Sequence, residues 1–262
     1  ARERVAAFSP DLIRAHGPWH AGLAGVCTAG ACGVPSILSV HTSHPERRRH
    51  ERGLRLRLLQ LLERYTIPRA DCVLCVSHHL TDYARTCRAR RVEVIYNRVY
   101  VEQFDVSRAS EAPRRPRILS VGRLDPPKDQ ACLIEAARDL DVELTLVGEG
   151  VNRLRLAEMV RRHGMEDRVT FISAVPHDRL QQVYAEADIF AMASAYEGFG
   201  IPVLEAMASG LPVVVNDIGP LVELVGDTGI VIEGLDAEGF RGALRRLMED
   251  PGRARAMGEL GR

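Results

Sequence analysis

From residue 117 onward, short runs of apolar and β-branched residues alternate with segments of helical periodicity. Strands joined through helices form parallel sheets, because a parallel neighbour is reached only by a crossover. The sequence therefore predicts one complete doubly wound, Rossmann-like α/β domain, with strands at 118–121, 143–147, 169–172, 189–192, 212–215 and 229–232. Its helices are expected near 128–139, 151–163, 177–187, 202–209 and 219–225, with one or two more after residue 236.

The first part of the chain repeats this pattern less completely. Strands are expected at 37–40, 72–76 and 92–95, and helices near 20–32, 46–65 and 78–88. Residues 107–116 contain two prolines and almost nothing apolar, which is typical of a linker. We therefore expect an incomplete amino-terminal Rossmann-like domain (1–106), a linker (107–116) and a carboxyl-terminal domain (117–262).

Composition and charge narrow the functional classes. Hydrophobic residues make up 46% of the 262 residues, and no run approaches the roughly 18 apolar residues that span a bilayer. The first residues also lack the apolar core of a signal peptide, so we expect a cytoplasmic chain. Residues 1–110 hold 17 Arg against 10 acidic residues, and the remainder 18 basic against 25 acidic, so charges of +7 and −7 cancel. The opposed halves predict domains with different ligands, and the net charge of 0 argues against a nucleic-acid partner.

A glycine-containing loop follows the strand predicted at 189–192. Gly198 and Gly200 lie in this loop, and Pro202 stands where the first turn of a helix favours proline. The loop should present backbone N–H groups at a helix N-terminus on the carboxyl edge of the sheet, where anions bind. Glu197 and Glu205 flank this site and would repel an anion, so sugar hydroxyls are their expected partners. For Glu205 alone, a favourable interaction with the helix dipole is the simpler alternative.

A second loop carries cations to the same edge. It follows strand 118–121 and contains Arg123 and Lys128, the only lysine among 35 basic residues. Because both loops leave the carboxyl edge of one sheet, Arg123 and Lys128 are expected to converge on the anion near residues 199–201.

An arginine-rich segment with leucines covers residues 47–62 of the first domain. A basic helix with an apolar stripe can lie on the surface of an anionic membrane, which would make the protein peripheral at the inner face. The favoured alternative is that the leucines pack on their own domain. The six cysteines are expected to be reduced, and Cys72 and Cys75 would face opposite sides of a strand, which disfavours a zinc site.

The carboxyl-terminal half resembles the second domain of retaining glycosyltransferases of the GT-B fold, those of glycosyltransferase family 4. The likeness covers nearly all of 117–233 and rests on VGRL at 121–124 with Lys128, LVGEG at 146–150, RVTFI at 168–172, YAEAD at 184–188, EGFGIPVLEAMA at 197–208 and GLPVV at 210–214. The amino-terminal half is similar more weakly, through DLIRAH at 11–16, GVPSILSVH at 33–41, ADCVLCVS at 70–77 and VIYN at 94–97.

The resemblance implies a role for each matching residue. Arg123 and Lys128 would hold the pyrophosphate of a nucleotide diphosphate sugar, Glu205 the ribose and Glu197 the sugar. His41 would support catalysis from the first domain, together with the catalytic Arg123, Lys128 and Glu197, and His16 is a candidate for the acceptor side. The remaining donor contacts would come from the loop at 173–177, where the base would lie, and from the glycine loop, namely Val175, Gly198, Phe199, Gly200 and Ile201.

The sequence also departs from the family pattern. Asp129 and Arg98 stand where members usually carry glycine, and nothing matches the first strand and glycine-rich loop or the final helix that returns to the first domain. We therefore expect a fragment, a truncated product or a chain that needs a partner.

The expected activity is that of a retaining hexosyltransferase with an unidentified acceptor. No metal or other cofactor is expected, because Arg123 and Lys128 can neutralise the diphosphate. Two alternatives stay open, a nucleotide-sugar 2-epimerase of the same fold and a non-catalytic nucleotide-sugar-binding subunit.

Overall fold

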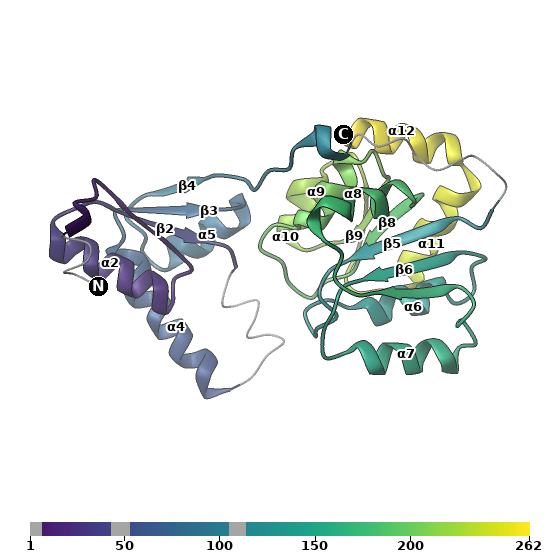
Figure 1. Ribbon diagram of the computed structural model, residues 1–262, viewed down its shortest axis with the longest axis horizontal. Coiled ribbons are helices and arrows are strands. Elements are labelled where there is room, and N and C mark those ends of the chain that lie inside the picture. Colours follow the sequence, from purple (N-terminus) through teal and green to yellow (C-terminus); the bar gives the residue numbers. More distant parts are fainter. Residues whose placement is uncertain (1–6, 43–52, 105–113) are drawn as a thin grey trace. The chain divides into compact units, whose positions relative to one another are not determined.

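The computed structural model describes residues 7–42, 53–104 and 114–262, and the chain divides into two compact units, Ala1–Asn97 and Arg98–Arg262 (Figure 1). No helix within these described ranges is long and apolar enough to cross a membrane.

The first unit contains a parallel sheet in the order β1-β2-β3-β4. Its strands are β1 (Ile13–His16), β2 (Ser36–Val40), β3 (Cys72–Cys75) and β4 (Val92–Val94), and its helices are α2 (His20–Cys32), α4 (Leu54–Thr66) and α5 (His78–Thr86), with the short 3₁₀ helix η1 (Ile67–Arg69). Three of these strands match the expected ones. β1 was not expected because its four residues include two polar ones, and pairing with β2 makes it a strand. α4 (Leu54–Thr66) covers the later part of the basic helix predicted at 46–65, and residues 46–52 of that prediction lie outside the described ranges.

The second unit is the expected doubly wound domain. Its strands are β5 (Arg117–Val121), β6 (Glu143–Val147), β7 (Val169–Ile172), β8 (Ile189–Met192), β9 (Val213–Asn216) and β10 (Ile230–Ile232), in the parallel order β10-β9-β8-β5-β6-β7. Its helices are α6 (Gln130–Ala137), α7 (Arg153–Arg162), α8 (His177–Ala185), α9 (Ile201–Ala208), α10 (Gly219–Val225), α11 (Ala237–Glu249) and α12 (Pro251–Gly261), and the short η2 (Val101–Phe104) precedes β5. The strand order reverses its direction between β5 and β8, which is where such sheets bind ligands.

Two apolar clusters cover the two faces of this sheet. Within β5, Ile118 belongs to the cluster that includes α6, α7 and α11, whereas Leu119 belongs to the cluster of α8, α9 and α10. Ile189 and Phe190 of β8 alternate in the same way. Because successive strand residues face opposite sides, these strands are buried on both faces, which explains their continuous apolar runs.

The boundary between the units lies earlier in the chain than the linker expected at 107–116. Phe104 of η2 is buried in the second unit and meets the ring of Tyr184 edge to face, with the ring centroids 5.8 Å apart. This aromatic contact ties residues 98–104 to the second unit. Residues 105–113 of the expected linker lie outside the described ranges.

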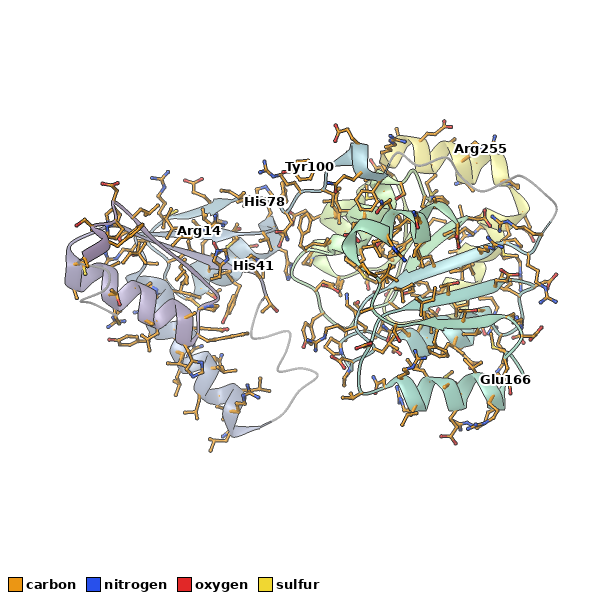
Figure 2. All side chains as sticks on the ribbon, viewed as in Figure 1. Arg14, His41, His78, Tyr100, Glu166 and Arg255 are labelled. Carbon is orange, nitrogen blue, oxygen red and sulfur yellow. The ribbon has the colours of Figure 1, made fainter. Side chains whose placement is uncertain are left out.

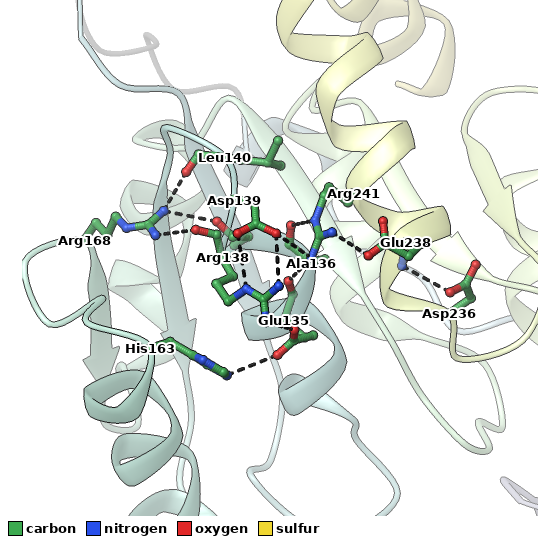
Figure 3. Close-up of polar contacts among 11 residues, drawn as sticks. Glu135, Ala136, Arg138, Asp139, Leu140, His163, Arg168, Asp236, Glu238 and Arg241 are labelled. Atoms are coloured by element: carbon green, nitrogen blue, oxygen red, sulfur yellow. Dashed lines mark hydrogen bonds and ion pairs between the residues drawn. The ribbon is translucent and has the colours of Figure 1, made fainter.

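Arginines hold the carboxyl end of α6 in place (Figure 3). Arg168 donates to the carbonyls of Ala137 (3.1 Å) and Leu140 (2.5 Å), and Arg241 of α11 donates to those of Ala136 (3.1 Å) and Glu135 (2.7 Å). These bonds give additional donors to carbonyl groups in the last turn of α6 and just beyond it, where intrahelical donors run out. They fix α6, whose other end follows directly after Lys128 and Asp129.

Candidate donor-binding site

Two loops meet at the point where the strand order reverses. They are the β5–α6 loop, residues 122–129, and the β8–α9 loop, residues 193–200. Asp129 N–H donates to the carbonyl of Ala193 (2.9 Å), and Ala195 N–H donates to that of Pro127 (2.7 Å). The contact exists because β5 and β8 are neighbours in the sheet, with Ile118 opposite Ile189. The cationic and acidic loops singled out in the sequence are thus bonded directly to each other.

Lys128 lies in the centre of this contact. Its ammonium forms an ion pair with Glu197 and approaches the Met192 sulfur at 3.4 Å. Both charged side chains are largely buried, with 17% and 16% of their surface exposed. Burial lowers the pKa of Lys128 to about 8, and the positive charge of Arg123 adds to the effect. The site therefore holds a desolvated cation that is charged at neutral pH.

Arg123 lies on the same loop but is mostly exposed and pairs with Asp125. Asp125 also accepts the backbone N–H of Val151 (3.1 Å), which joins this loop to the one after β6. Gln130 is buried and donates to the carbonyl of Arg123 (3.0 Å). Neither Asp125 nor Gln130 was singled out from the sequence, since only their tertiary bonds distinguish them from ordinary loop and helix residues.

Glu205 is buried on α9 and is held by a residue of α8. The hydroxyl of Tyr184 donates to Glu205 Oε2 at 2.7 Å, and it lies 3.2 Å from the carbonyl of Pro202. Burial and the neighbouring carboxylate raise the pKa of Tyr184 well above its ordinary value, so the phenol stays protonated as a donor. Tyr184 is therefore a positioning residue for Glu205. It belongs to the YAEAD motif, but its role became visible only in the structure.

The β8–α9 loop is fixed by an amide and a glycine. Asn216, buried at the end of β9, accepts the backbone N–H of Ser194 and donates to its carbonyl, both at 2.9 Å. Gly200 directly precedes α9 with a φ of +102°, and a Cβ there would lie 2.6 Å from a methyl group of Leu221. A larger residue at position 200 would be strained by the positive φ and also by its contact with Leu221.

The other residues predicted to contact the donor differ in how far they are buried. Gly198 and Phe199 are buried, and Ile201, the first residue of α9, is exposed. Val175 is half-buried and packs against the apolar cluster of α8, α9 and α10. The backbone around the start of α9 is thus placed at the same sheet edge as Lys128 and Glu197.

His16 and His41 form a pair in the first unit, at the carboxyl ends of β1 and β2. His16 Nδ1 lies 3.3 Å from His41 Nε2, and the rings stack with centroids 5.6 Å apart. Figure 2 labels Arg14 and His41 on the first unit. Burial lowers the pKa of His41, and the positive charges of His16 and Arg14 add to the effect. The predicted catalytic histidine therefore favours its neutral form.

The sequence matches two family models. The model described as "Glycosyl transferases group 1" matches residues 102–262, and the one described as "Glycosyltransferase Family 4" matches residues 1–103. The chain is 29% identical to a glycogen synthase of Mycobacterium tuberculosis, over 94% of this chain and 62% of that protein. It therefore spans less than two thirds of the length of this curated relative.

Two solved structures share the fold. The sucrose-phosphate synthase of Thermosynechococcus elongatus has a TM-score of 0.86 and 24% identity, with 99% of this chain and 70% of that one covered. Anabaena HepE in complex with UDP and glucose has a TM-score of 0.84 and 23% identity, with 99% and 74% covered. Both parallel-sheet units match those of GT-B proteins, as the sequence predicted.

Proposed function

This chain belongs to the group 1 glycosyl transferases, and we propose that it binds a nucleoside diphosphate sugar and transfers the sugar to an acceptor hydroxyl with retention of anomeric configuration. The relative and the neighbours described above are named as synthases or hold UDP, which favours transfer over the epimerase alternative.

The contact of the two loops around Lys128 carries this proposal. A desolvated ammonium, an exposed guanidinium on the same loop and the N-terminus of α9 are grouped at one edge of the sheet. Each attracts negative charge, and a diphosphate carries more of it than a single cation neutralises. Arg123 and Lys128 would hold the diphosphate without a metal ion. When the donor binds, the ammonium of Lys128 exchanges part of its contact with Glu197 for a phosphate oxygen.

The carboxylates have separate tasks in this proposal. Glu197 accepts hydrogen bonds from hydroxyls of the sugar, next to Lys128. Glu205, held by Tyr184, accepts them from the ribose. The base lies along the loop that contains Val175.

The reaction breaks the bond between the anomeric carbon and the diphosphate oxygen while the acceptor oxygen bonds to the same carbon from the same face. The acceptor proton passes to the departing diphosphate oxygen. Positive charge develops on the sugar and negative charge on the diphosphate, so Lys128, Arg123 and the start of α9 stabilise the transition state more than the ground state. The supporting catalytic role of His41 remains part of this proposal, and its ring favours the neutral form.

Titration calorimetry with UDP, GDP and ADP tests donor binding and names the base. We expect one nucleotide to bind and Lys128→Met to weaken it about 10- to 150-fold, the range for a charge-assisted hydrogen bond. Arg161→Ala, which removes an exposed cation from the last turn of α7, is the matched control and should bind as the unmodified chain does. Equal affinity in Lys128→Met and the unmodified chain would remove Lys128 from the site.

Stereochemistry can be tested without the acceptor. Slow transfer of the sugar to water releases a free sugar, and its first anomer is observed by NMR before the anomers equilibrate. The proposal expects the anomer of the donor. Release of the opposite anomer would contradict retention while leaving the binding result intact.

A further inference from the structure

Helix α4 is apolar on two opposite faces. Leu56 and Leu59 are buried against the first unit, with 7% and 8% of their surface exposed. Four other large residues face solvent and are 47–73% exposed, namely Leu54, Leu58, Leu61 and Tyr65. Their spacing of four, three and four residues lines them up along one side of the helix. The sequence prediction that the leucines pack on their own domain therefore accounts for only some of them.

This outer stripe is bordered by positive charge. Arg55, Arg57 and Arg64 are exposed, and at about 100° per residue Arg57 and Arg64 lie on one side of the stripe and Arg55 on the other. The only acidic residue of α4, Glu63, is buried on the opposite face. It accepts hydrogen bonds from Trp19 Nε1 (2.6 Å) and from the hydroxyl of Tyr83. The solvent-facing side of α4 thus combines apolar residues with arginines and no carboxylate.

The carboxyl end of the stripe is aromatic and cationic. The Arg69 guanidinium lies 3.6 Å from the centre of the Tyr65 ring and donates to the Tyr65 carbonyl (2.8 Å). A tyrosine beside an arginine suits the boundary between apolar chains and polar headgroups.

We propose that the outer face of α4, formed by Leu54, Leu58, Leu61 and Tyr65 between flanking arginines, lies on the surface of an anionic lipid bilayer. The apolar stripe enters the boundary between headgroups and acyl chains, and the arginines contact lipid phosphates. A second copy of this chain fits less well, because a symmetric pairing of the same face brings like charges together. The proposal is independent of sugar transfer.

Co-sedimentation of the full chain with lipid vesicles tests this surface. We expect binding to vesicles of phosphatidylcholine with phosphatidylglycerol, weakening as salt rises, and much less binding to phosphatidylcholine alone. Replacing Arg55, Arg57 and Arg64 together by glutamine should weaken binding roughly 100-fold, since each arginine contributes severalfold.

The apolar stripe is tested by Leu58→Gln with Leu61→Gln, which should abolish sedimentation with the anionic vesicles. Leu260→Gln, at an exposed leucine of α12 in the second unit, is the matched control and should bind fully. All of these substitutions are at exposed positions, and circular dichroism checks that each variant is folded.

Three results would overturn the proposal. The first is the absence of binding to anionic vesicles, and the second is equal binding by the control and the α4 variants. The third is a dimer of the unmodified chain, seen by light scattering, that the double leucine variant loses without any lipid dependence. This third result would assign the stripe to self-association instead.

Discussion

The affinity of this chain for a nucleoside diphosphate should depend on pH through Lys128. Its ammonium is largely buried, and its pKa is lowered to about 8. Below pH 8 the ammonium is charged and contacts the diphosphate. With a pKa of about 8, roughly ten chains in eleven keep the proton at pH 7 and roughly one in eleven at pH 9, so affinity should fall about tenfold between pH 7 and pH 9.

The size of this fall also has an upper limit. The loss cannot exceed the whole contribution of the ammonium, about 1.5–3 kcal/mol or 10- to 150-fold. Lys128→Met should show this reduced affinity at every pH, because it has no proton to lose. Lys128→Arg keeps its charge throughout and should bind with little dependence on pH.

Calorimetry from pH 7 to pH 9, with whichever of UDP, GDP and ADP binds, measures these affinities. Lys128→Met also serves as the reference for protonation of the nucleotide's phosphates. Both proteins bind the same nucleotide, so protonation of the phosphates changes both affinities alike. The test is the ratio of the affinity of the unmodified chain to that of Lys128→Met. A ratio that stays constant from pH 7 to pH 9 would refute the assignment of a desolvated lysine to the diphosphate.

Three further substitutions test the rest of the site. Glu205→Gln should weaken a ribonucleotide about 10- to 150-fold but leave its 2′,3′-dideoxy analogue nearly unaffected, and equal weakening of both in calorimetry would exclude the ribose contact. Tyr184→Phe removes the donor to a buried carboxylate and should lower the free energy of unfolding in urea by about 1.5–3 kcal/mol; an unchanged denaturation midpoint would show that the 2.7 Å bond contributes nothing. Gly148→Ala places a Cβ against the carbonyl oxygen of Gly122 at a residue with φ of +140°, so nucleotide affinity and thermal stability should both fall, and native values for both would contradict the tight contact of these loops.

Local patterns in the sequence predicted most of the elements. Apolar runs such as 143–147 and 169–172 match β6 and β7, and the prediction of a helix at 219–225 matches α10. Turn chemistry placed the glycine loop before α9, because Gly200 permits a positive φ and Pro202 fixes its own φ at a helical value, whatever surrounds them. These signals depend on residues that are close together in the sequence, so they predict local structure without knowledge of the fold. β1 was not predicted from the sequence, because two of its four residues are polar and its pairing with β2 is not local.

Contacts between distant segments were decided by the tertiary structure. The strand order brings β8 beside β5 and thereby pairs Lys128 with Glu197. Tyr184 became a partner of Glu205 only through the packing of α8 on α9, and the leucines of α4 separated into a buried and an exposed face. Periodicity indicates that a side of a segment is apolar, but not which surface covers it. That depends on where the rest of the chain folds, and in this protein it determines both the proposed donor site and the proposed lipid-binding face.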